Sequence, residues 1–76
     1  MTNTQRFMTA LVQLSDGNQD TFTSIDVVRA AGLPEIPANY DEIPRQLNQE
    51  GWFSDLVVPP TNGRDVWSGL RPRHID

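Results

Sequence analysis

Apolar residues recur at helical spacing in two stretches of the first half of the chain, TQRFMTALVQL and TSIDVVRAAG. Spacings of three and four residues place them on one face of an amphipathic helix. The positions concerned are Phe7, Met8, Leu11 and Leu14 in the first stretch and Ile25, Val28 and Ala31 in the second. Thr23 followed by Asp26 matches a helix-capping signature, and Gly32 before Leu33-Pro34 ends the second helix. Two helices are predicted, with a short strand at residues 21–23 between them.

A third helix is predicted in NYDEIPRQLNQEG, where Tyr40, Ile43 and Leu47 share one face and Gly51 ends the pattern. Pro44 leaves two starting points open. A helix that begins at Tyr40 would lose a hydrogen bond at the proline, at a cost of about 3 kcal/mol. A helix that begins at Pro44 loses nothing, because proline is favoured at the first helical position. We favour the second reading, with residues 39–43 as a separate turn.

The last third of the chain alternates strand-forming residues with a turn signal. WFSDLVV and DVWSGL are rich in strand formers, and Asn62-Gly63 between them favours a tight hairpin. Pro59-Pro60 cannot donate ladder hydrogen bonds, so the strands must open before the tip. The sequence therefore predicts a small α+β domain with three helices and a C-terminal β-hairpin that turns near residues 60–64.

The whole chain, residues 1–76, is expected to form one domain with a small core, and residues 71–76 a flexible tail. Gly51 would redirect the chain so that Trp52 and Trp67 close the open side of the helical core. The side chains expected to be largely buried are Phe7, Leu11, Leu14, Ile25, Val28, Leu33, Ile43, Leu47, Trp52, Leu56 and Trp67.

Composition narrows the range of functions. Cysteine is absent, which excludes disulfides, zinc–thiolate sites and thiol nucleophiles. No apolar run approaches the length of a membrane span, and the chain shows no leader-like pattern, so we expect a soluble cytoplasmic protein. The net charge is −4, and residues 1–55 hold eight acids against three arginines. Any nucleic-acid surface would therefore lie in the last third of the chain, since duplex binders are usually basic.

Three quoted segments resemble winged helix-turn-helix domains. TSIDVVRAAGLP is similar to the second helix and following turn of that family, LNQEGWF to the exit from its recognition helix, and NGRDVWS to its wing tip and returning strand. The resemblance spans roughly residues 4–70. It implies a wing formed by the hairpin and a third helix that enters the major groove of DNA.

The family pattern implies a set of nucleic-acid-binding residues on the third helix, the wing tip and the tail. These are Arg45, Gln46, Asn48, Gln49, Arg64, Arg71 and Arg73. The implied function is a small DNA-binding transcriptional regulator or accessory factor, weak as a lone monomer and with homodimerisation as an open alternative. Asp41 and Glu42, just before the third helix, depart from the neutral or basic residues typical of the family.

A second reading is an acidic winged-helix module that binds another protein through Tyr40, Asp41, Glu42 and Trp52. A third is an inhibitor, for instance phage-encoded, that presents acids to a host nucleic-acid enzyme. Catalysis is not expected, because the single histidine lies near the C-terminus and no Gly-rich phosphate loop or metal-ligand cluster is present. We expect no cofactor, metal, membrane contact or small-molecule substrate.

Overall fold

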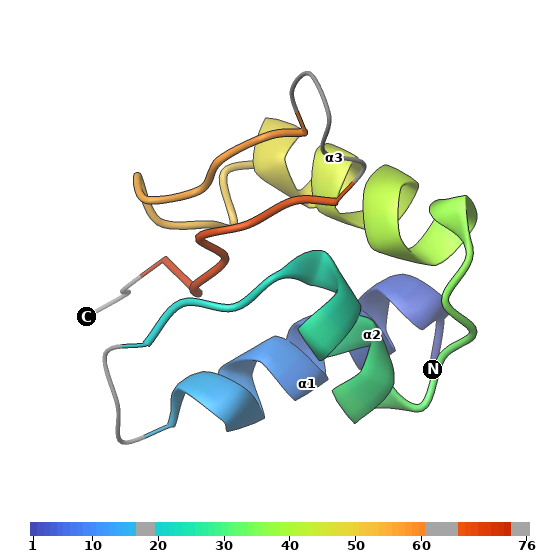
Figure 1. Cartoon of the computed structure of the whole chain (residues 1–76). Helices are drawn as coiled ribbons and strands as arrows, with labels where there is room; N and C mark the ends of the chain where they lie inside the picture. The colour runs from blue at the N-terminus through green and yellow to red at the C-terminus, as the bar shows by residue number, and fades with distance from the viewer. Residues whose placement is uncertain (17–19, 61–65, 74–76) are drawn as a thin grey trace.

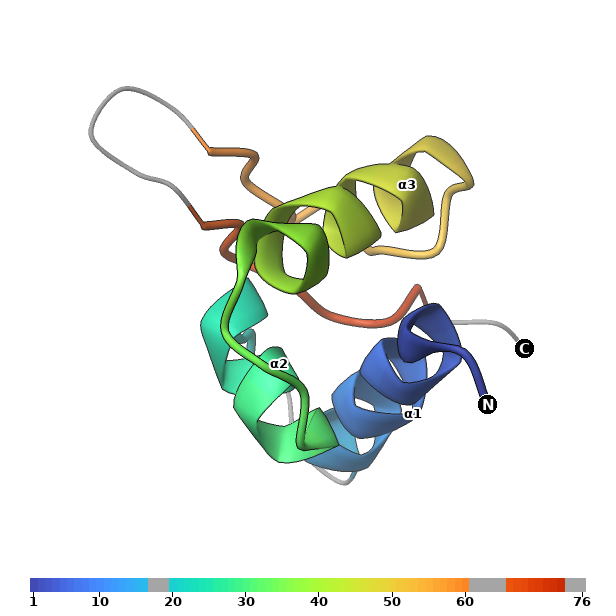
Figure 2. The ribbon, with the colours of Figure 1, turned by 90° about the vertical axis from the view of Figure 1, so that its right-hand side faces the viewer.

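A computed structural model of the protein describes residues 1–16, 20–60 and 66–73. Within these ranges the chain forms three α-helices, α1 (Asn3–Ser15), α2 (Ser24–Ala31) and α3 (Ile43–Gln49), and a π-helical turn η1 (Ala38–Glu42) before α3. Helices α1 and α2 lie against each other, and residues 66–73 run between this pair and α3 (Figures 1 and 2). No helix in the described ranges is both long and apolar enough to cross a membrane.

Local side-chain chemistry sets the ends of the first two helices. The hydroxyls of Thr2 and Thr23 each accept a hydrogen bond from the backbone amide three residues later. The side-chain oxygens of Gln5 and Asp26 in turn accept from the backbone amides of Thr2 and Thr23. This reciprocal capping satisfies amides that have no partner inside the helix. Helix α2 ends at Gly32 in the left-handed conformation, with φ of 72°. The predicted cap at Thr23 and stop at Gly32 are both confirmed.

The third helix begins at Ile43, one residue before the start that the favoured reading gave, and η1 runs directly into it. Pro44 lies in the first turn of α3 and its side chain is fully buried. Proline has no amide hydrogen to donate to the carbonyl four residues earlier. The turn before Pro44 therefore lacks one normal helical hydrogen bond, and it is wound as the wider π-helical η1. Asn39 does not cap the helix; its side-chain amide donates to the Pro34 carbonyl oxygen at 2.8 Å and is buried.

The core lies where the three helices meet the C-terminal segment. Its buried apolar side chains are Phe7, Ala10, Leu11, Val27, Val28, Leu33, Ile43, Leu47, Phe53, Trp67 and Leu70. The expected burial is confirmed for seven positions: Phe7, Leu11, Val28, Leu33, Ile43, Leu47 and Trp67. It is wrong for Trp52 and Leu56, which are 44% and 59% exposed, and only partial for Leu14 and Ile25.

The predicted C-terminal hairpin wing, and with it the α+β class, is wrong for the part of the chain that the structure describes. This part holds three helices, no β-strand, and only three isolated antiparallel bridges: Phe22 with Leu70, Phe53 with Pro72, and Val58 with Ser68. The described fold is therefore small and all-helical. The expected hairpin tip at Asn62-Gly63 lies outside the described residues.

A turn within the first predicted strand explains why no ladder forms. The amide of Val57 donates to the carbonyl oxygen of Ser54 at 3.3 Å, and the amide of Leu56 donates to the Ser54 hydroxyl at 3.4 Å. These local bonds turn the chain at residues 54–57, between two of the bridges. Serine offers the backbone such an alternative to a ladder, and the prolines at 59 and 60 prevent pairing from resuming beyond Val58.

The returning segment accommodates this turn at Gly69. Gly69 has φ of 66°, and a Cβ atom there would overlap the carbonyl oxygen of Leu56. Only glycine permits both the left-handed backbone and this close approach. Residues 52–58 and 66–73 are thus joined by two isolated bridges, Phe53 with Pro72 and Val58 with Ser68. Between these bridges the backbone of Gly69 packs against the backbone of Leu56.

Candidate functional site

The predicted DNA-reading residues of α3 are on the surface, but two of them are bound to carboxylates of the same chain. Arg45, Gln46, Asn48 and Gln49 are all exposed. Arg45 forms an ion pair with Asp41 at 2.8 Å, and the side-chain amide of Gln46 donates to a Glu50 carboxylate oxygen at 3.1 Å. The only arginine of α3 is therefore already paired with a carboxylate.

Asp41, which was expected to contact a partner, has a structural role in holding Trp67. Its Oδ1 atom accepts from the Trp67 indole nitrogen at 3.1 Å as well as from Arg45. The Arg45 guanidinium lies 5.6 Å from the centre of the Trp67 ring, within cation–π range. On the backbone, the Trp67 amide donates to the Ser24 hydroxyl at 3.1 Å, and the Ser24 amide donates to the Trp67 carbonyl at 2.8 Å. Trp67 is thereby fixed between α2 and α3.

Trp52 is the second tryptophan, and it lies at the surface. Its indole nitrogen donates to Oε1 of Glu50 at 3.1 Å, while the other oxygen of Glu50 accepts from Gln46. This bond satisfies the single polar atom of the indole, so the exposed ring offers mainly apolar surface. Leu56 and Val58, farther along the same segment, are also exposed.

Backbone pairing brings Arg73 to Trp52, although 20 residues separate them in the sequence. The Arg73 amide donates to the Trp52 carbonyl at 2.9 Å, and the Ser54 amide donates to the Arg71 carbonyl at 2.9 Å. Residues directly opposite each other in an antiparallel pair project to the same side, which places Trp52 and Arg73 together. A Cβ atom on Gly51 would lie 3.5 Å from an Arg73 guanidinium nitrogen, so the Arg73 side chain extends to Gly51, the residue before Trp52. We call Glu50, Trp52 and Arg73 the Trp52 surface.

The other predicted site residues fall elsewhere. Tyr40 is half-buried and packs against the core, whereas Glu42 is exposed. Arg71 is half-buried beside Ser54. Arg64 lies outside the described residues, as do residues 74–76 of the expected tail.

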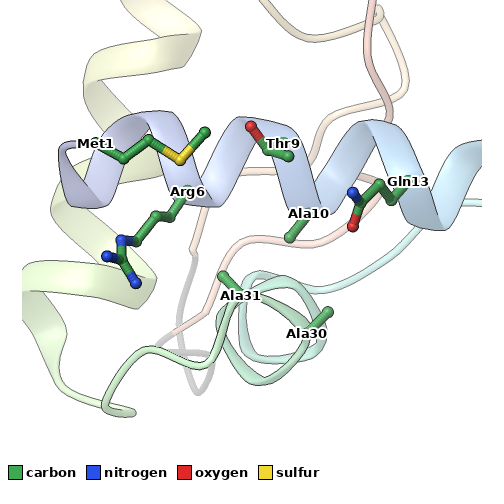
Figure 3. Close-up of a pocket in the computed structure, with 7 residues that line it drawn as sticks. All are labelled: Met1, Arg6, Thr9, Ala10, Gln13, Ala30 and Ala31. Atoms are coloured by element: carbon green, nitrogen blue, oxygen red, sulfur yellow. The ribbon is translucent and has the colours of Figure 1, made fainter.

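A shallow groove of about 150 Å³ lies between α1 and α2 (Figure 3). Alanines 10, 30 and 31 lie along its middle, with Arg6 and Gln13 toward opposite ends. Met1 and Thr9 complete the lining. The groove is small and its charged group is a single surface arginine, so it lacks the convergent polar groups typical of a ligand pocket.

The described residues contain no group of three or more histidines and carboxylates placed to hold a metal ion. Comparison of the chain with protein-family models, curated proteins and solved structures finds no match. The resemblance to winged helix-turn-helix domains thus rests on the three sequence segments alone, and the wing itself is absent from the described residues.

Proposed function

We propose that the protein is an interaction module that binds another polypeptide through the Trp52 surface. The observation that carries this proposal is the exposure of Trp52, whose indole is held by Glu50 and whose backbone is paired with that of Arg73. Tryptophan and arginine are the residue types most enriched among the few that dominate binding energy at protein interfaces. A ring fixed by a hydrogen bond also loses little rotational freedom when a partner covers it.

The charge around α3 supports a protein partner over duplex DNA. Residues 38–60 contain four carboxylates and one arginine, and that arginine is paired with Asp41. Glu42 and Glu50 remain on the surface at the two ends of α3. Phosphate neutralisation by arginine and lysine supplies most non-specific DNA affinity. A helix whose only cation is occupied, and whose ends are acidic, is poorly suited to approach a phosphate backbone.

Affinity capture from source lysate, with and without nuclease, tests this function. The immobilised wild type should retain a protein after nuclease treatment, and Trp52→Ala should lose it. Val12→Ala is the matched control, because Val12 is also an exposed apolar residue, 51% exposed, but lies on α1. The control should retain the same protein. Loss of the captured protein on nuclease treatment, or equal loss in both variants, would overturn the proposal.

A further inference from the structure

The Trp52 surface combines one charge of each sign with an exposed apolar ring. Glu50 hydrogen-bonds to the Trp52 indole, and Arg73 lies alongside, against Gly51. Glu50 and Trp52 are exposed, and Arg73 is too. A uniformly basic partner would meet Arg73 and a uniformly acidic one would meet Glu50, so neither is complementary to the whole surface.

We propose that the occupant of the Trp52 surface is a second copy of this chain, related to the first by a twofold axis. This inference rests on the proposed interaction function and names its partner. In a twofold interface the same patch faces itself, so a residue at one position meets a different residue of the other copy and the contact is repeated. Glu50 of each copy then lies opposite Arg73 of the other, and the two Trp52 rings meet between these pairs.

The contacts within one chain leave the necessary groups available. The two oxygens of Glu50 accept from Gln46 and Trp52, which are neutral donors, and a carboxylate has about four acceptor sites in all. The ion pairs Arg29–Glu35 and Arg45–Asp41 do not involve Glu50 or Arg73. Each copy has a net charge of −4, so general repulsion opposes the specific contacts and the dimer is expected to be weak.

Sedimentation equilibrium over a wide concentration range tests the dimer, with two charge-reversing variants, Glu50→Arg and Arg73→Glu. In each variant alone, like charges face each other across the twofold axis, and association should weaken by at least about tenfold, since opposed like charges are costly at an interface. An equimolar mixture of the two variants restores opposite charges at both contacts. The mixture should therefore associate about as strongly as the wild type.

Recovery in the mixture cannot come from a merely structural effect of either substitution, because each copy still carries its own altered residue. Circular dichroism checks that both variants are folded. A wild type that stays monomeric at every concentration would overturn the proposal, as would variants that associate as well as the wild type or a mixture that does not recover. If the wild type is monomeric while Trp52→Ala still loses a captured protein, only the identity of the partner is wrong and the interaction function stands.

Discussion

Replacing Gly69 with alanine tests the packing that stands where a hairpin was expected. A Cβ atom at position 69 would overlap the Leu56 carbonyl oxygen and lie 3.1 Å from its carbonyl carbon. The substitution carries two costs. A non-glycine residue in the left-handed region costs about 1–2 kcal/mol. Relieving the overlap must also separate the two segments, which breaks the paired Val58–Ser68 hydrogen bonds of 2.8 and 3.0 Å, at about 1 kcal/mol each.

Gly32→Ala is the matched control for this measurement. Gly32 has a similar φ of 72°, but nothing lies within 4 Å of the position its Cβ would take. It should therefore show only the backbone cost of about 1–2 kcal/mol, whereas Gly69→Ala should destabilise by about 3–4 kcal/mol. Urea unfolding followed by tryptophan fluorescence measures both, because Trp67 is 2% exposed in the folded protein. Equal destabilisation by the two substitutions would refute the close contact between Gly69 and Leu56.

Two further substitutions and one binding measurement probe the core, a helix cap and the surface. Leu47→Ala should lower the free energy of unfolding by about 2–5 kcal/mol, because Leu47 is 3% exposed; a melting temperature within a degree or two of wild type would show that α3 is not packed on the core. Thr23→Ala removes the cap of α2 and should cost about 1 kcal/mol in denaturant unfolding, with unchanged helix content. Random duplex DNA should bind the monomer weakly or undetectably in fluorescence anisotropy at physiological salt, and tight salt-insensitive binding would contradict the reading of α3.

The helices could be predicted from the sequence because their signals are local. The capping pair of Thr23 with Asp26 and the left-handed Gly32 determine the ends of α2 within a few residues of chain. Pro44 likewise restricts where α3 can begin. Helical periodicity was less accurate about the buried face of α2, since Val27 is fully buried and Ile25 only partly.

The C-terminal segments could not be predicted from strand propensity, because the deciding interactions are specific and partly long-range. WFSDLVV has the composition of a strand, yet Ser54 bonds to the next residues and turns the chain. The role of Gly69 depends on the Leu56 carbonyl oxygen, which only the fold brings beside it. Side-chain direction in such a segment alternates, so a one-residue shift exchanges which aromatic is buried. Trp52 and Phe53 are neighbours and so project to opposite sides, and here Phe53 is the buried one and Trp52 the exposed one.

The candidate site followed from a pairing that the sequence did not indicate. The sequence assigns Arg73 to nucleic-acid binding and Trp52 to binding a protein. It predicts that the third-helix residues make the main contacts with DNA. The bond from Arg73 to the Trp52 carbonyl unites those two residues, while the ion pair of Arg45 with Asp41 occupies the charge of α3. The sequence shows the excess of acids, but only the fold shows that Arg45 is already paired.

Site-specific photo-crosslinking in source cells tests most directly whether the Trp52 surface, and not α3, is the binding site. A photoreactive amino acid is placed at position 52 in one variant and at position 48, on the exposed side of α3, in another. We predict a protein adduct from position 52 that survives nuclease treatment, with the mass of two copies of the chain if the partner is a second copy, and no adduct from position 48. A nuclease-sensitive adduct from position 48, with none from position 52, would contradict the proposed function and return the binding site to α3.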